Sequence, residues 1–330
     1  MRVLEIVCLA VCLTAMVGCR ARGQEPSEES SASSRSQAPA GTPAPVVRPP
    51  AVAGGFYPGE ADVLRTTVQG FLAKVPKRPV KGTIVAAMAP HAGYVYSGQV
   101  AAYTHKLLES AEFDTVVIIG HDAFRGAVAF LCPVDYFETP LGRVPVDREM
   151  LAGIQAFHEG IVANQAIHDR DHTVEVQLPF FQVTGRAFKI VPVLFGNPTL
   201  ENARILAEAI RAAAGDRKVL VLASTDMSHY PPYEAARTLD LATLDVLKTF
   251  DPRALFDHLR SKERAGRIPN LKTAMCASGG VLTALEYARQ KGADRIEVLK
   301  YANSGDVSAG NKAQVVGYGA AVFLRTANGK

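Results

Sequence analysis

The feature that most constrains the fold of this chain is a series of short apolar segments that alternate with segments of helical periodicity. Four of these apolar segments, rich in Val, Ile, Leu and Ala, lie at 83–89, 115–120, 189–195 and 218–223. Strands with few polar positions are buried on both faces, which is typical of a parallel sheet covered by helices. The sequence therefore predicts an α/β fold with a mainly parallel central sheet and helices on both faces.

Helices are expected between these strands because apolar residues recur there every three or four positions. They are expected at 61–75, 97–108, 148–157, 202–214, 234–249, 252–260 and 277–290, and 173–181 is expected to be helical up to Pro179. Further strands are expected at 127–137, a candidate antiparallel strand broken at Pro133, and at 296–301 and 314–324. Ligands of open α/β sheets bind at the carboxyl ends of strands, so the residues that follow each strand are candidates for a site.

The first 50 residues differ in composition from the rest of the chain. An apolar run at 3–18 is short for a membrane span and typical of a signal peptide. It ends in Met-Val-Gly-Cys19, which resembles a bacterial lipobox, so residues 1–19 are expected to be a signal peptide whose Cys19 is lipidated. A plain secretory signal with a chance cysteine is the alternative.

Residues 20–50 are rich in Ser, Pro, Ala and Glu and cannot bury enough apolar surface to fold. They are expected to form a disordered tether, with one α/β domain at 51–330. A lipid anchor followed by a tether predicts a membrane-anchored lipoprotein outside the cytoplasm, on the periplasmic side. The oligomeric state is not predicted.

Charge and cysteine content narrow the class of protein further. The net charge is only +4 over 330 residues, and no run of Lys and Arg indicates a nucleic-acid partner. Of the five cysteines, only Cys132 and Cys276 lie in the expected domain. In an oxidising compartment, a disulfide between these two is one alternative to a chemical role for Cys276.

Polar residues follow four of the expected strands. His91 follows the first, His121 and Asp122 the second, Asp226 and His229 the strand at 218–223, and 303–306 the strand at 296–301. The carboxyl ends of parallel strands lie at one edge of a sheet. We therefore expect these residues to form one site, which binds a small molecule or a peptide.

Cys276 stands just before the helix expected at 277–290. A helix N-terminus favours the thiolate form of cysteine, which is either a metal ligand or a nucleophile. Two imidazoles and one thiolate together suit a borderline-soft divalent ion: Zn, Fe(II) or Cu.

Two further groups of residues are candidates with an alternative structural role. His172 and Glu175 lie three positions apart on an expected helix and share a face, although acidic residues also favour a helix N-terminus for its dipole alone. Tyr94 and Tyr96 follow His91 and either line an apolar wall of the site or pack under the next helix.

Four motifs resemble those of the Memo family, whose bacterial and archaeal members are called AmmeMemoRadiSam system protein B. They are Ala-Pro-His-Ala-Gly-Tyr at 89–94, His-Thr-Val-Glu-Val-Gln-Leu-Pro at 172–179, Ser-Thr-Asp-Met-Ser-His at 224–229 and Asn-Ser-Gly-Asp at 303–306. The resemblance spans about residues 51–325. It implies a fold similar to class III extradiol dioxygenases, which are non-haem iron enzymes.

The resemblance also implies roles for single residues. The metal positions fall on His91, His121 and Cys276, where Cys276 stands in place of the carboxylate of the ring-cleaving enzymes. The catalytic histidine falls on His229 with Asp226 beside it. His172 is a further catalytic candidate, and the expected substrate contacts are Tyr94, Glu175, Asn303 and Asp306.

Three functions remain open at this point. The first is a metal-dependent oxidoreductase that acts on a small substrate, with Fe(II) favoured over Zn or Cu as the ion. The second is a non-catalytic module that binds a peptide or small ligand in a vestigial active site. The third is metal-free chemistry with Cys276 as nucleophile and His91 or His229 as base.

Overall fold

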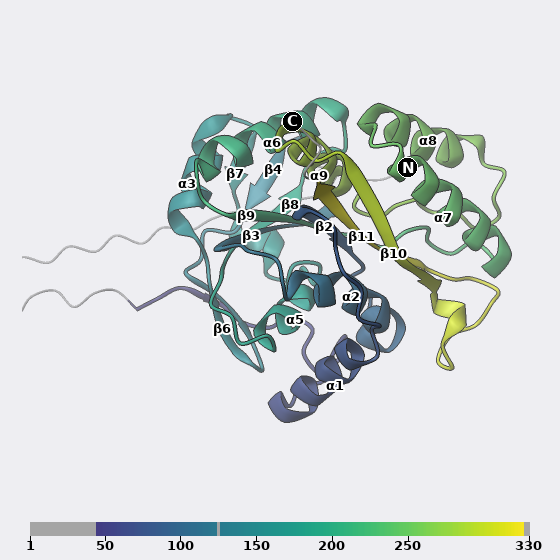
Figure 1. Ribbon diagram of the computed structural model, residues 1–330, viewed down its shortest axis with the longest axis horizontal. Helices are drawn as coiled ribbons and strands as arrows, with labels where there is room; N and C mark the ends of the chain where they lie inside the picture. The colour runs from purple at the N-terminus through teal and green to yellow at the C-terminus, as the bar shows by residue number, and fades with distance from the viewer. Residues whose placement is uncertain (1–43, 124–125, 327–330) are drawn as a thin grey trace, which may run out of the picture. The chain divides into compact units, whose positions relative to one another are not determined.

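The computed structural model describes residues 44–123 and 126–326 (Figure 1). The predicted signal peptide, the lipidated Cys19 and most of the predicted tether lie outside these described residues. The folded unit begins at Ala44 and so includes residues 44–50, which the sequence places in the tether. Within the described ranges, no helix has the length and apolar character needed to cross a membrane.

The core of the fold is an eight-stranded mixed sheet with a parallel centre. In spatial order its strands are β10 (Arg295–Asn303), β11 (Gly317–Arg325), β2 (Thr83–Ala89), β9 (Val219–Ser224), β3 (Thr115–Asp122), β8 (Lys189–Phe195), β4 (Ala129–Leu131) and β7 (Ile161–Ala163). The strands β2, β9, β3 and β8 run parallel, whereas β11 is antiparallel to β2 and β4 is antiparallel to β8. The predicted parallel sheet is confirmed at its centre.

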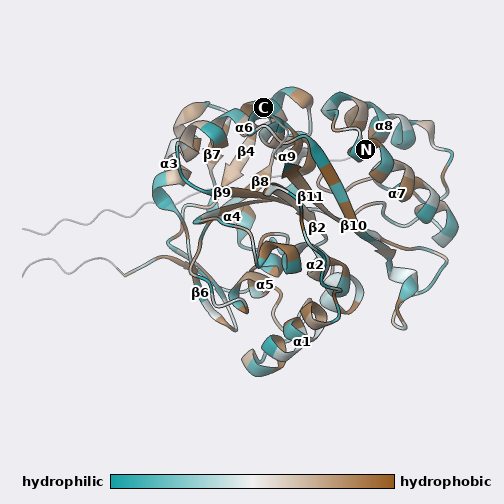
Figure 2. Cartoon of the chain, viewed as in Figure 1, coloured by the Kyte–Doolittle hydropathy of each residue, from teal (hydrophilic) through white to brown (hydrophobic). Residues whose placement is uncertain are grey.

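Helices cover both faces of this sheet, as predicted (Figure 1). One face carries α2 (Tyr94–Leu108), with α1 (Ala61–Ala73) and α5 (Leu178–Gln182) packed against it. The other face carries α3 (Arg148–Phe157), α6 (Leu200–Ala214) and α9 (Ser278–Gln290), with α7 (Tyr233–Lys248) and α8 (Pro252–Ala265) beside them. Hydropathy follows these layers, since the sheet is mostly brown and the outer helix faces are mostly teal in Figure 2.

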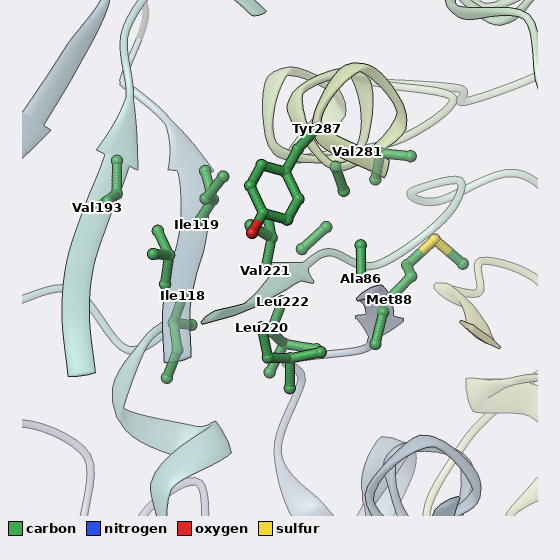
Figure 3. Close-up of a cluster of buried hydrophobic side chains, with 14 of the residues drawn as sticks. Ala86, Met88, Ile118, Ile119, Val193, Leu220, Val221, Leu222, Val281 and Tyr287 are labelled. Atoms are coloured by element: carbon green, nitrogen blue, oxygen red, sulfur yellow. The ribbon is translucent and has the colours of Figure 1, made fainter. Parts of the chain in front are cut away.

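The central strands are apolar along their length because both of their faces are buried. Figure 3 shows Ile118 and Ile119 of β3 and Val221 of β9 beneath Val281 and Tyr287 of α9. All five side chains are fully buried. This rigid centre sets the positions of the loops that follow the strands.

The structure differs from the sequence prediction around two prolines. The segment at 173–181 is not one helix ending at Pro179: a 3₁₀ turn at Glu175–Gln177 leads into α5, whose first turn contains Pro179. Proline is favoured there because the first turn of a helix needs no backbone N–H from it. The predicted strand at 127–137 is two strands, β4 and β5, separated at Pro133.

The remaining elements are short and, apart from β5, were not predicted. A second sheet joins β1 (Val47–Arg48), β5 (Tyr136–Thr139) and β6 (Gly142–Pro145), and short helices lie at Gln165–His168 (α4) and Ser304–Asp306 (η2). This small sheet fastens the segment at 44–50 to the domain, because β1 pairs in parallel with β5.

The strand order explains how distant residues meet. The chain runs from β2 through α2 to β3 and β8, and then returns to place β9 between β2 and β3. The carboxyl ends of β2, β9 and β3 are therefore neighbours. Because β10 and β2 are both antiparallel to β11, β10 also ends at this edge.

Candidate functional site

A cavity of about 450 Å³ opens at the carboxyl ends of β2, β3 and β9. Its walls come from the loops after these strands, from the segment before α1, and from the loop between β10 and β11. Its lining includes Phe56, His91, Tyr96, His121, His172, Asp226, His229, Tyr230, Asn311, Gln314 and Tyr318. Five of the predicted site residues thus share one cavity.

His91 is buried at the floor of this cavity. Its Nδ1 lies 3.0 Å from the backbone oxygen of Ser224, which leaves Nε2 directed to the Sγ of Cys276 at 3.1 Å. A backbone carbonyl on one ring nitrogen fixes the ring orientation, as it does for many metal-binding histidines. Burial lowers the pKa of His91 well below its usual value, and the neighbouring His172 lowers it further, so the ring is neutral at pH 7.

Cys276 lies two residues before the first residue of α9 and is buried. The backbone N–H of Asp226 points at its Sγ from 3.3 Å. Burial raises the pKa of the Cys276 thiol well above its usual value, and the nearby Asp226 carboxylate adds to this shift. Burial therefore affects the pKa of this thiol more than the N-terminus of α9 does, although the sequence predicted that the helix would favour the thiolate. The hydrogen bond from the Asp226 backbone lowers the pKa but does not offset burial, and a cation bound at the sulfur would favour the thiolate further.

Asp226 links the two sides of the cavity. Its Oδ1 accepts hydrogen bonds from the backbone N–H groups of His91, at 2.8 Å, and Ala92, at 3.3 Å. Its Oδ2 lies 3.9 Å from the Nε2 atoms of both His91 and His229. The Nε2 of His229 is buried and has no hydrogen-bond partner among the described residues. It is thus a polar atom held ready for a group that enters the cavity.

His121 and His172 complete the group of imidazoles. The ring centroid of His91 lies 5.4 Å from that of His172 and 6.1 Å from that of His121. His121 is exposed, whereas burial lowers the pKa of His172 and keeps its ring neutral. The loop that bears His172 also supports His121, since Thr173 Oγ1 accepts a hydrogen bond from the His121 backbone at 3.2 Å.

Asp122, next to His121, does not line the cavity and instead holds the start of α9. It accepts hydrogen bonds from the Ser278 hydroxyl at 3.1 Å and from the Gly279 backbone at 3.2 Å. This contact joins the end of β3 to the segment that carries Cys276.

The donor chemistry suits a divalent ion, although the side chains do not form a preassembled cage. In the ranges 44–123 and 126–326, no group of three or more His, Cys, Asp or Glu side chains is close enough to hold a metal ion as it stands. Imidazole nitrogens and a sulfur are ligands that Fe(II), Zn and Cu accept. The approach of His91 Nε2 to Cys276 Sγ and the unpartnered Nε2 of His229 fit an ion and a ligand at this place.

Two of the predicted substrate contacts lie away from the cavity. Tyr94 is buried in the first turn of α2, and its hydroxyl donates to the backbone oxygen of Val176 at 2.7 Å. Glu175 is fully buried and forms an ion pair with the buried Arg48. Glu175 also accepts a hydrogen bond from the backbone of Ala51 at 2.8 Å, so it anchors the segment that precedes α1.

The other two predicted contacts stabilise the turn after β10. The side chain of Asn303 accepts from the Gly305 backbone at 2.9 Å, and Asp306 accepts from the Asn303 backbone at 2.8 Å. Asp306 also accepts from the Tyr233 hydroxyl at 2.5 Å. This reciprocal cap shapes the start of the loop that forms one cavity wall, but neither side chain lines the cavity.

Sequence reasoning missed part of the wall and left one alternative that the structure removes. Phe56, Tyr230, Tyr318 and the loop residues of 309–316 were not predicted to line the site. The sequence signal for Tyr230 was its position directly after His229. The alternative disulfide is wrong, because Cys132 and Cys276 are both free and buried.

The fold and the cavity define an α/β protein with a pocket of histidines at the ends of its central strands and one buried cysteine in contact with His91. The profile of the family described as "Memo-like protein" matches residues 48–322, and the chain belongs to this family. The resemblance that the four motifs indicated is thereby confirmed.

Curated relatives agree with this assignment. A MEMO1 family protein of Archaeoglobus fulgidus is 37% identical over 281 residues, which cover 84% of this chain and 99% of the relative. A MEMO1 family protein of Ignicoccus hospitalis is 36% identical over 292 residues, with 84% and 99% covered. Among solved structures, an uncharacterized protein, JW3007, of Escherichia coli K12 matches 71% of this chain and 99% of its own, at 12% identity and a TM-score of 0.44.

Proposed function

We propose that this Memo-family protein binds one divalent metal ion in the cavity, with His91, His121 and Cys276 as its ligands. Fe(II) is the favoured ion and Zn or Cu are alternatives, because a thiolate with two imidazoles suits all three. The observation that carries the proposal is the distance of 3.1 Å between Nε2 of His91, which lines the cavity, and Sγ of Cys276, which is buried behind it.

We further propose an oxidoreductase-type activity on a small substrate that enters this cavity. The ion, when bound, would supply Lewis-acid or redox chemistry. His229 would accept or donate a proton at Nε2, which is unpartnered, and Asp226 would orient it from 3.9 Å. Burial lowers the pKa of His229 below its usual value, which leaves the ring neutral and able to accept a proton at pH 7. His172, beside His91, is a second group placed for proton transfer.

Elemental analysis of protein purified without oxygen tests the metal proposal. Wild-type protein is expected to retain about one ion per chain, and His91→Ala to lose it. His158→Ala is the matched control, because His158 lies at the end of α3 and does not line the cavity. Full metal occupancy in His91→Ala would refute the assignment of the ligands.

A non-catalytic binding module is the second candidate. The observation that favours it is the size and lining of the cavity, which is large enough for a side chain or small ligand without any ion. Ligand binding that survives chelation and His91→Ala would support this function over the first.

Cysteine chemistry without metal is the third candidate, and the burial of Cys276 opposes it. A thiol whose pKa is raised is a weak nucleophile at neutral pH. Iodoacetamide labelling of native protein distinguishes the two roles. Metal ligation predicts slow labelling that a chelator accelerates, whereas a free nucleophile predicts fast labelling that a chelator does not change.

We also propose that the protein works as a lipoprotein on the periplasmic side of a membrane. Support comes from the apolar run at 3–18, from Cys19 and from the composition of 20–50. Membrane fractions are expected to contain the wild-type chain, and Cys19→Ser is expected to release it. Equal membrane association of both proteins would reject lipidation at Cys19.

A further inference from the structure

Tyr230 has an unusual backbone conformation directly beside the candidate catalytic His229. Its φ is 73°, in the left-handed region, which is unfavourable for a residue that has a Cβ and is especially rare for an aromatic one. Two other non-glycine residues of the described ranges share this feature: Phe250 follows the end of α7, and Asn270 is of a type that tolerates it. Left-handed residues are common at the ends of helices, where Phe250 lies, but Tyr230 lies in the loop after strand β9.

The surrounding backbone imposes this conformation on Tyr230. Its N–H donates to the oxygen of Val315 at 2.7 Å, and the N–H of Val315 donates to the oxygen of Pro231 at 3.0 Å. On the other side, the N–H of His229 donates to the oxygen of Thr273 at 3.0 Å. The turn is thus fixed from two neighbouring segments, and such strain persists only where the surroundings impose it.

The side chain of Tyr230 does little for the fold. It is 44% exposed, its ring lies 5.4 Å from that of His229, and it lines the mouth of the cavity. Its hydroxyl makes no hydrogen bond within the described part of the chain. A glycine would adopt this backbone without strain. The backbone conformation does not explain why a tyrosine occupies this position. A role of its exposed ring does.

The rest of the cavity wall indicates what this ring contacts. Tyr96 and Tyr318 provide further aromatic surface, and Asn311 and Gln314 provide neutral amides. No Lys or Arg of the described residues lines the cavity. The nearest cation on this loop, Lys312, lies over the ring of Tyr233 at 4.8 Å. The described side chains of the wall suit a flat uncharged group and include no Lys or Arg that would pair with a carboxylate or phosphate.

We propose that Tyr230 is a specificity-determining residue that stacks on a planar, uncharged group of the ligand at the mouth of the cavity. The inference rests on the proposed role of the cavity as a ligand site. It does not require that a metal ion be bound.

The test uses benzyl alcohol as an uncharged aromatic probe and benzoate as its anionic counterpart. Affinities are measured by NMR on the full chain after its metal content has been recorded and any ion has been removed with a chelator, because a bound ion would itself bind benzoate. Wild-type protein and Tyr230→Phe are expected to bind benzyl alcohol equally well and benzoate at least tenfold more weakly. Tyr230→Gly is expected to bind benzyl alcohol at least fivefold more weakly than wild type, while its melting temperature stays the same or rises. A purely structural role for Tyr230 would instead lower the melting temperature and spare the affinity.

Asn270→Gly is the matched control, because it relieves the same backbone strain outside the cavity. It is expected to leave the affinity for both probes unchanged. The proposal is overturned if wild-type protein binds neither probe, if benzoate binds as tightly as benzyl alcohol, or if Tyr230→Gly keeps full affinity. Metal content, measured on the same samples, reports separately on the proposed metal function.

Discussion

The Sγ of Cys276 lies 3.1 Å from the Nε2 of His91, although 185 positions separate the two residues in the chain. Each of them is oriented by a separate backbone contact. His91 is held through Nδ1 at the Ser224 oxygen, and Cys276 receives the N–H of Asp226. Both contacts come from the end of β9 and the residues just after it, and β9 lies between β2, which precedes His91, and β3, which ends with His121 and Asp122. The return of the chain to this central position is what assembles the site.

The buried ion pair between Arg48 and Glu175 is expected to be essential for stability. Arg48→Met leaves the Glu175 carboxylate buried without its cation, which typically lowers the free energy of unfolding by about 3–5 kcal/mol. Urea unfolding measures the change. Replacing both residues together, with Arg48→Met and Glu175→Leu, is expected to recover part of the loss because no buried charge remains.

The control for this pair is Arg204→Ala, which removes an exposed pair with Glu201. Little change is expected there, because water and salt screen exposed charges. An Arg48→Met protein as stable as Arg204→Ala would show that the segment at 44–50 is not anchored as described.

Acid is expected to destabilise the protein through His105. This ring is buried against Phe180 and Phe181, and burial lowers its pKa to about 4 despite the hydrogen bond to Gln177. The unfolded chain, whose histidine pKa is about 6.5, binds more protons between pH 6.5 and 4. Stability is therefore full above pH 6.5 and falls as the pH drops toward 4, by up to about 1.4 kcal/mol per pH unit from this group.

Unfolding free energies of wild type and His105→Gln across this pH range isolate the effect. The variant is expected to show a shallower slope between pH 4 and 6.5 and an unchanged slope above pH 7. Identical slopes in both proteins would mean that His105 does not remain neutral in the fold.

Gly120 is expected to tolerate no side chain. A Cβ at this position would lie 1.9 Å from Thr173 Oγ1, the atom that supports the His121 backbone. Gly120→Ala is expected to lower the free energy of unfolding by about 1–3 kcal/mol, as overpacking typically does, and to weaken metal binding through His121. Thr173→Ala in the same chain is expected to restore stability in part.

The matched control is Gly70→Ala, in the exposed middle of α1, where a Cβ would meet no atom within 4 Å. Alanine is a better helix former than glycine, so this variant is expected to gain up to about 1 kcal/mol. Equal losses in Gly120→Ala and Gly70→Ala would contradict the close approach of Thr173.

The parts of the site that were predicted from the sequence depend on one rule of parallel sheets. His91, Asp226 and His229 follow apolar strands, and strand ends meet at one edge whatever the order of the strands. The bounds of β2 and β8 were predicted correctly because the strands are buried on both faces after their first one or two residues. That signal is local and strong.

The residues that were misassigned depend on long-range contacts. Glu175 has a polar sequence context typical of a site, but its partner Arg48 lies 127 positions away in a segment predicted to be disordered. The helix after His91 was predicted to begin at 97, whereas α2 begins at Tyr94 and buries its ring, so Tyr94 does not contact the cavity as predicted. The left-handed backbone of Tyr230 results from pairing with Val315, which no local pattern indicates.

X-ray absorption spectroscopy of the metal-loaded protein tests the central claim most directly, because it detects the atoms bound to the ion. We predict one sulfur neighbour at about 2.3 Å together with imidazole nitrogens, and loss of the sulfur neighbour in Cys276→Ser. A wild-type spectrum with only nitrogen and oxygen neighbours would contradict the proposal that Cys276 and His91 hold the same ion.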